Sequence, residues 1–102
     1  MTEIEQVAAV GRRKEAVARV YLRSGTGKTM VNGKELNEYL GRDVLVMQVR
    51  EPLEVTETLG RYDIHAVVRG GGPAGQAGAL RLGIARALVE MDESYKIGRA
   101  HV

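Results

Sequence analysis

The residues whose spacing comes nearest to a catalytic or cofactor site form a glycine-rich run. Gly70-Gly71-Gly72-Pro73-Ala74-Gly75 satisfies the G-x-G-x-x-G spacing, which cradles a dinucleotide pyrophosphate where a strand turns into a helix. The fold that uses this turn needs a second strand with an acidic residue for the ribose, and that strand would lie beyond about residue 95 of a 102-residue chain. Pro73 also removes one backbone N–H from the turn. We therefore predict no cofactor, and keep a small nucleotide-binding enzyme as an alternative function.

The other reactive residue types lack the spacing of a catalytic centre. Gly27-Lys28-Thr29 imitates the end of a P-loop, but the first glycine of that motif is missing. The two histidines, His65 and His101, are far apart in the sequence, and the chain contains no cysteine. No pair of residues has the spacing of metal ligands. The sequence therefore predicts neither an enzyme nor a metal site.

A strand is expected before the glycine-rich run and a helix after it. Alternation of apolar and polar residues predicts a half-buried strand over residues 61–69, with one face made by Tyr62, Ile64, Ala66 and Val68. After the glycines, apolar residues at helical spacing predict a helix that lies on a sheet, through the stripe Ala77, Leu80, Ile84, Leu88 and Met91.

The first half of the chain predicts more strands and two short helices. Residues 16–23 alternate between an apolar face and a largely basic face, and residues 6–10 suit a further short strand. The turn Ser24-Gly25-Thr26-Gly27, the extended residues 28–31 and the turn Asn32-Gly33 together indicate a hairpin. Residues 35–40 have helical spacing. Residues 43–50 suit either a buried strand or a helix that ends before Pro52, and we predict the helix.

Charge is distributed in blocks along the chain. Fifteen Lys and Arg against 13 Asp and Glu give a net charge of only +2. Residues 11–34 nevertheless carry +6 and residues 61–89 carry +3, while residues 35–60 between them carry −4. This pattern favours one surface that meets a polyanion, against the alternative of a mixed solvated surface. The acidic middle segment leaves a protein-interaction domain as a second alternative function.

Length and composition predict one ordinary globular domain. The chain is 44% hydrophobic, and its longest aliphatic stretch, residues 44–47, is far shorter than the roughly 18 residues of a membrane span. We therefore expect no membrane partner and a cytoplasmic location. The aromatic residues are four tyrosines, without Phe or Trp, so an aromatic platform for base stacking is not expected.

Three glycines inside the expected last helix require a reason. Gly75, Gly78 and Gly83 each cost a helix about 1 kcal/mol relative to alanine, and a close approach of another backbone is the usual explanation. A phosphodiester chain would fit beside Arg81 and Arg86, whereas tight packing of helix on sheet explains Gly75 and Gly78, taken individually, at least as well. Basic residues near the glycine-rich turn and at residues 12–14 add weight to a nucleic-acid partner.

Two segments resemble a known family closely. Gly11-Arg12-Arg13-Lys14-Glu15-Ala16-Val17-Ala18-Arg19-Val20 and Gly70-Gly71-Gly72-Pro73-Ala74-Gly75-Gln76-Ala77-Gly78-Ala79 are similar to the universal small-subunit ribosomal protein nine family, in its bacterial form. The similarity includes residues 32–33, 50–54, 83–88 and 90–94, and covers roughly residues 7–96.

The resemblance implies a fold, a partner and a place. The fold is α+β, a mostly antiparallel four-stranded sheet backed by helices with a left-handed βαβ crossover, as in the second domain of ribosomal protein S-five. The partners are the 3′ major (head) domain of 16S rRNA and the neighbouring small-subunit head proteins, and the protein would support translation near the P site without enzymatic activity. The residues that the resemblance identifies as rRNA contacts are Arg12, Arg13, Lys14, Lys28, Arg69, Gly70, Gly71, Gly72, Gly75, Gln76, Arg81 and Arg86.

The C-terminal end departs from the family pattern. Family members continue into a long basic tail that reaches towards the P-site tRNA, whereas this sequence ends in Ile97-Gly98-Arg99-Ala100-His101-Val102, which is similar to a translated sequencing adapter. We expect residues 1–96 to form the single ribosomal-protein domain and residues 97–102 to be non-native. Without that tail, the contact with P-site tRNA is not expected from this chain.

Overall fold

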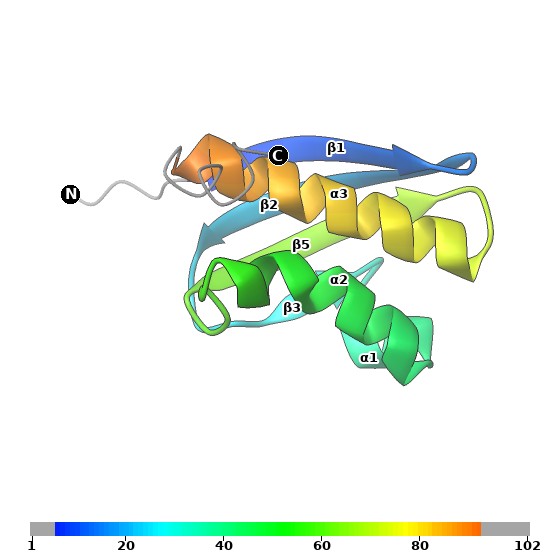
Figure 1. The fold of residues 1–102 in the computed structure, drawn as a ribbon, viewed down its shortest axis with the longest axis horizontal. Coiled ribbons are helices and arrows are strands. Elements are labelled where there is room, and N and C mark those ends of the chain that lie inside the picture. Colours follow the sequence, from blue (N-terminus) through cyan, green and yellow to red (C-terminus); the bar gives the residue numbers. More distant parts are fainter. Residues whose placement is uncertain (1–5, 93–102) are drawn as a thin grey trace.

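A five-stranded sheet with three helices on one of its faces makes up the structure (Figure 1). The computed structural model describes residues 6–92; residues 97–102, predicted to be non-native, lie outside this range, as does His101. The elements in chain order are β1 (Gln6–Arg13), β2 (Ala16–Ser24), β3 (Thr29–Val31), β4 (Lys34–Glu35), α1 (Leu36–Leu40), α2 (Asp43–Val55), β5 (Tyr62–Arg69) and α3 (Pro73–Met91).

The strands are arranged in the order β1-β2-β5-β3-β4. All neighbouring pairs are antiparallel except β3 and β5, which are parallel and are joined by the crossover through α1 and α2. In Figure 1 the helices face the viewer, β3 and β5 both run to the right, and β5 lies above β3. When this view is turned so that the strands point upward, β5 lies to the left of β3, so the crossover is left-handed. This confirms the expected α+β fold, with a fifth, short strand because Lys34–Glu35 pairs with β3 around the Asn32-Gly33 turn.

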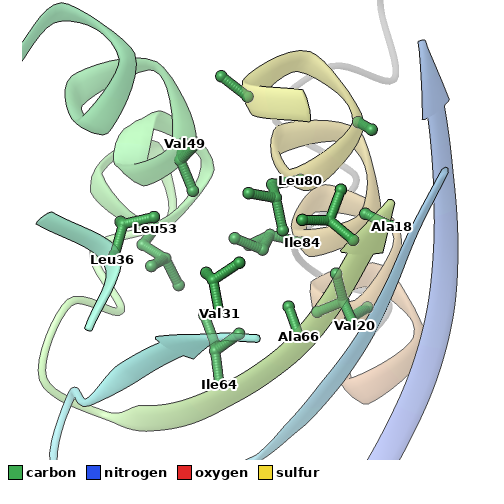
Figure 2. Close-up of a cluster of buried hydrophobic side chains, with 14 of the residues drawn as sticks. Ala18, Val20, Val31, Leu36, Val49, Leu53, Ile64, Ala66, Leu80 and Ile84 are labelled. Carbon is green, nitrogen blue, oxygen red and sulfur yellow. The ribbon is translucent and has the colours of Figure 1, made fainter. Parts of the chain in front are cut away.

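The alternation seen in the sequence places one face of the sheet under the helices. Ala16, Ala18, Val20 and Leu22 of β2 are completely buried, and Ile64, Ala66 and Val68 of β5 are at most 3% exposed. Figure 2 shows Val20, Ile64 and Ala66 pointing towards Leu80 and Ile84 of α3. Both strand predictions and the apolar stripe of the last helix are confirmed. The other face of the sheet carries no helix among the described residues.

The expected hairpin of the first half is wrong in its partners. The strand at residues 16–24 does not pair with residues 29–31, because β5 lies between them. The turn Asn32-Gly33 instead joins β3 to β4. Residues 24–28 bridge the start of β5, where the carboxylate of Asp63 accepts hydrogen bonds from three of their backbone N–H groups. These hydrogen bonds tie the loop to the start of β5.

Helix α2 continues through Pro52 and ends at Val55, so the expected stop before the proline is wrong. A proline inside a helix loses one backbone hydrogen bond. Here the extra turn buries Leu53, which is 5% exposed and packs in the core beside Leu36 and Val49 (Figure 2). The turn is also closed by Thr56, whose N–H and hydroxyl both donate to the Pro52 carbonyl. These contacts offset the missing bond.

Candidate nucleic-acid interface

The basic end, as we call it, is a cluster of four basic residues: Arg12, Arg13, Lys14 and Arg69. It lies where the β1–β2 turn, the end of β5 and the start of α3 meet (Figure 1). Cross-strand pairing aligns Arg12, Val17 and Arg69 across three strands on the sheet face without helices. Arg13 lies on the other face, where its side chain covers Gly78 of α3. The strand register therefore gathers cations from two segments more than 50 residues apart in sequence.

The turn of the basic end has a strained backbone. Lys14 and Glu15 have φ of 48° and 71°, and together they form the two-residue connection between β1 and β2. Both values belong to the turn type that normally takes Asn and Gly. Gly70 and Gly71 pack directly on this turn, and a β-carbon on Gly71 would lie 2.8 Å from the Lys14 carbonyl oxygen. The glycine-rich run is thus shaped to fit the neighbouring turn of the same protein.

Helix α3 begins at the basic end without a side-chain cap. Gly72 is the N-cap, Pro73 follows it, and the first turn contains no acidic residue. The N-terminus of a helix favours an anion because its first N–H groups and the helix dipole are positive. The basic residues and the helix terminus therefore attract negative charge at the same place.

A chain of side-chain hydrogen bonds fixes the glycine-rich turn. The Asn32 amide donates to the Tyr39 hydroxyl at 3.2 Å, and that hydroxyl donates to Gln76 Oε1 at 2.8 Å. Gln76 Nε2 in turn donates to the Gly70 carbonyl at 3.0 Å. Gln76, predicted as an rRNA contact, therefore also holds the turn in place.

The glycines of α3 have a packing partner inside the protein. β-Carbons on Gly75 and Gly83 would meet the Arg13 carbonyl at 3.2 Å and Val20 Cγ2 at 2.7 Å. Gly83 also lies against the backbone of Gly11 in β1. Of the two explanations that the sequence left open, tight packing of helix on sheet accounts for Gly83 and for Gly75, which is itself buried. A β-carbon on Gly78 would instead meet the side chain of Arg13 first.

Three of the predicted rRNA contacts lie away from the basic end. Arg81 is exposed on α3 and forms an ion pair with Glu51 of α2 at 2.6 Å. The Arg86 guanidinium donates to the Val10 carbonyl of β1 at 2.8 Å. Lys28 precedes β3, at the end of β5 opposite Arg69. The structure therefore brings together nine of the twelve predicted residues and leaves these three apart.

The backbone N–H groups of the loop before β3, which contains Lys28, already bind a carboxylate of the protein itself. The carboxylate of Asp63 accepts hydrogen bonds from the N–H groups of Lys28, Thr26 and Gly27 at 3.0, 2.9 and 3.1 Å. These donors, with the Lys28 N–H first in importance, hold the pKa of Asp63 below its ordinary value of 3.8, and the positive charge of Arg23 acts in the same direction. Asp63 therefore occupies the amide groups that a phosphate would otherwise bind.

Two basic residues were missed by the residue-by-residue prediction. Arg19 and Arg23 are exposed on β2, on the same helix-free sheet face as Arg12 and Arg69. They lie progressively further from the basic end, because Arg19 pairs with Val67 of β5 and Arg23 with Asp63. Both residues could have been predicted from the sequence, because the alternation of residues 16–23 places them on one largely basic face of the strand.

Other kinds of site are not seen in the described part of the chain. Among residues 6–92, no group of three or more His, Cys, Asp and Glu side chains is placed to hold a metal ion. Over the same residues, no helix combines the length and the apolar character that a membrane span requires.

Comparison with known proteins places the chain in a family. The family model of ribosomal protein S9/S16 matches residues 11–100. The small ribosomal subunit protein uS9 of Gemmatimonas aurantiaca is 54% identical over 92 residues, which is 90% of this chain and 71% of that protein. This confirms the resemblance inferred from residues 11–20 and 70–79. The chain belongs to the ribosomal protein S9 family, whose members are structural ribosomal proteins and not enzymes.

Proposed function

We propose that this protein is a structural constituent of the small ribosomal subunit that binds the 3′ major (head) domain of 16S rRNA. The observation that carries the proposal is the convergence of Arg12, Arg13, Lys14 and Arg69 around the uncapped N-terminus of α3. In this position the protein would support translation near the P site, next to other head proteins and in the cytoplasm. Contact with the P-site tRNA itself is not part of the proposal.

The proposed mechanism is neutralisation of phosphates, aided by backbone donors. Exposed Arg and Lys side chains release counterions when they pair with phosphates, and this term supplies most of the sequence-independent affinity. The start of α3 adds backbone N–H groups aimed at the same place. Such contacts fix the position of the protein on folded RNA, whereas base edges play a smaller part.

The experiment is a titration of the purified protein against a head-domain fragment of 16S rRNA and an unrelated RNA of equal length, over a series of salt concentrations. We expect preferential binding to the head fragment, with affinity falling as salt rises. Equal weak binding to both RNAs would contradict recognition of the head domain by this chain.

Variants test whether the basic end is the contact. Arg12→Ala with Arg13→Ala should weaken binding and lower the salt slope by about 1 for each phosphate that is no longer neutralised. Lys34→Ala with Arg61→Ala, which removes the same charge from exposed positions outside the basic end, is the matched control. Equal slopes for the two double variants would remove the basic end from the interface.

The exposed side of α2 suits a neighbouring head protein. Val44, Met47 and Val55 are 72%, 66% and 68% exposed, and the exposed acidic residue Glu54 lies on the same helix. An apolar surface with negative charge fits a protein partner with a basic contact surface. Met47→Glu should weaken binding to head proteins and leave binding to rRNA unchanged. Loss of rRNA binding in this variant would contradict a protein contact at α2.

A further inference from the structure

The sheet face without helices carries a ring pair that the composition did not predict. Tyr21 of β2 and His65 of β5 are directly opposite each other in the strand register. Their ring centroids are 6.2 Å apart and their planes differ by 28°, so the rings are stacked. His65 is exposed and Tyr21 is partly exposed. Counting Phe, Trp and Tyr missed this pair because one of its rings is a histidine, brought next to the tyrosine by the register.

The neighbours of the ring pair leave its outer surface open. Ala8 of β1 pairs with Tyr21, and Met30 of β3 pairs with His65, so the four residues form one row across four strands. Ala8 is too small to cover the tyrosine ring. A hollow of about 550 Å³ lies over part of this row and is lined in part by Tyr21, Met30 and His65.

Positive charge surrounds the ring pair. Arg19 and Arg23 flank Tyr21 along β2, two residues on either side and on the same sheet face. Lys28 lines the hollow, as does Arg23. The carboxylate in the hollow, that of Asp63, is bound by three backbone N–H groups. Three cations, Arg19, Arg23 and Lys28, outnumber this one carboxylate, so the surface around the ring pair is positive on balance.

We propose that Tyr21 and His65 form a platform on which an unpaired RNA base stacks, while Arg19 and Arg23 bind the adjacent phosphates. Aromatic rings on an open sheet, flanked by basic residues, are how sheet-based RNA-binding modules hold single-stranded bases. Charge and rings together favour RNA over an acidic protein, which would use the arginines but not the rings. The inference rests on the proposed RNA-binding function and adds to it a site for a single-stranded nucleotide, apart from the phosphate contacts of the basic end.

The experiment uses the full chain and a short unstructured RNA that contains one fluorescent adenine analogue, whose emission is quenched when it stacks. We expect quenching and saturable binding with the single strand, and no quenching with a duplex of the same sequence. Tyr21→Leu should abolish the quenching and weaken binding by about 5-fold or more, the effect of losing one stacked base. Tyr21→Phe, which keeps the ring, should bind and quench like the unchanged protein.

The outcomes separate this inference from the proposed function. Quenching that survives in Tyr21→Leu, or displacement of the RNA by polyglutamate as readily as by unlabelled single strand, would overturn the stacking site. Loss of selectivity for the head fragment with quenching intact would overturn the proposed function alone. If Tyr21→Leu does not fold, His65→Ser replaces it as the test variant and should reduce the quenching in the same way. The comparison of single strand with duplex uses the unchanged protein and needs no variant.

Discussion

Gly11 of β1 and Gly83 of α3 lie with their backbones against each other. A β-carbon on Gly11 would overlap the Gly83 nitrogen, and one on Gly83 would lie 2.7 Å from Val20 Cγ2. The pair lets α3 rest directly on β1 and β2, and this packing fixes the position of the helix whose first turn forms part of the basic end.

We expect Gly83→Ala to destabilise the protein although alanine favours a helix. Overpacking a core contact typically costs about 1–3 kcal/mol, which exceeds the gain of about 1 kcal/mol in helix propensity. Gly78→Ala is the matched control in the same helix, because its β-carbon would meet the flexible Arg13 side chain, at 3.0 Å from Cγ. Denaturant unfolding should show a decrease in stability for residue 83 and none for residue 78. Equal effects at both positions would contradict the close packing on β1.

Asp63 should make stability depend on pH in the acid range. Its pKa is lowered in the folded state, so the unfolded chain binds more protons and stability rises with pH up to the ordinary value of 3.8. We expect stability to fall as pH is lowered from about 4 through the folded pKa, and Asp63→Asn to flatten this dependence. Glu54→Gln, at an exposed position, controls for the change in net charge. Parallel curves for Asp63→Asn and the unchanged protein would show that the loop hydrogen bonds contribute nothing.

Glu15→Gly should stabilise the protein. Glu15 has a φ of 71°, which glycine adopts without strain. Replacing a non-glycine residue by glycine at such a φ removes about 1 kcal/mol of backbone strain from the folded state. Thermal unfolding should show a higher midpoint. Glu35→Gly, an exposed glutamate in extended backbone, should lower the midpoint instead. A lower midpoint for Glu15→Gly would mean that the carboxylate contributes more than the turn strain costs.

Asn32→Ala should be strongly destabilising for an exposed turn residue. The Asn32 side chain donates to the Val68 carbonyl and accepts from the Val68 N–H, both at 2.9 Å, and so extends the pairing of β3 with β5. Each of these part-buried groups that is left without a partner lowers the free energy of unfolding by about 1–3 kcal/mol. Asn32→Asp keeps the acceptor and should be less destabilising. Hydrogen exchange at the Val68 amide would report the bond directly, and unchanged protection in Asn32→Ala would contradict its role.

Sequence patterns located the strands and helices but not their neighbours. The alternation in residues 16–23 and 61–69 identified β2 and β5 because one face of each lies under the helices. β5 lies between β2 and β3, and the contacts made there join distant residues, such as Thr26 and Asp63, which are hydrogen-bonded and 37 positions apart. The alternation of residues within one strand does not indicate which other strand lies beside it.

The candidate site was predictable to a similar degree. Resemblance and charge pointed to residues 12–14 and 69–72, and the structure places them together. The partner of Arg81 could not be foreseen, because Glu51 is 30 positions away on another helix. The same holds for Tyr21 and His65, which become neighbours only through the register of two strands.

The extensive packing of α3 on β1 also bears on synthesis of the protein. Of the described elements, β1 is the first to leave the ribosome and α3, the helix that covers it, is the last. The basic end likewise needs residues 12–14 and residues 69–76, so neither the core nor the proposed RNA surface is complete on a half-made chain. Because domains fold as units during translation, folding has to wait until nearly the whole described segment has emerged. The nascent chain therefore carries its positive charges without the shape that would arrange them for RNA.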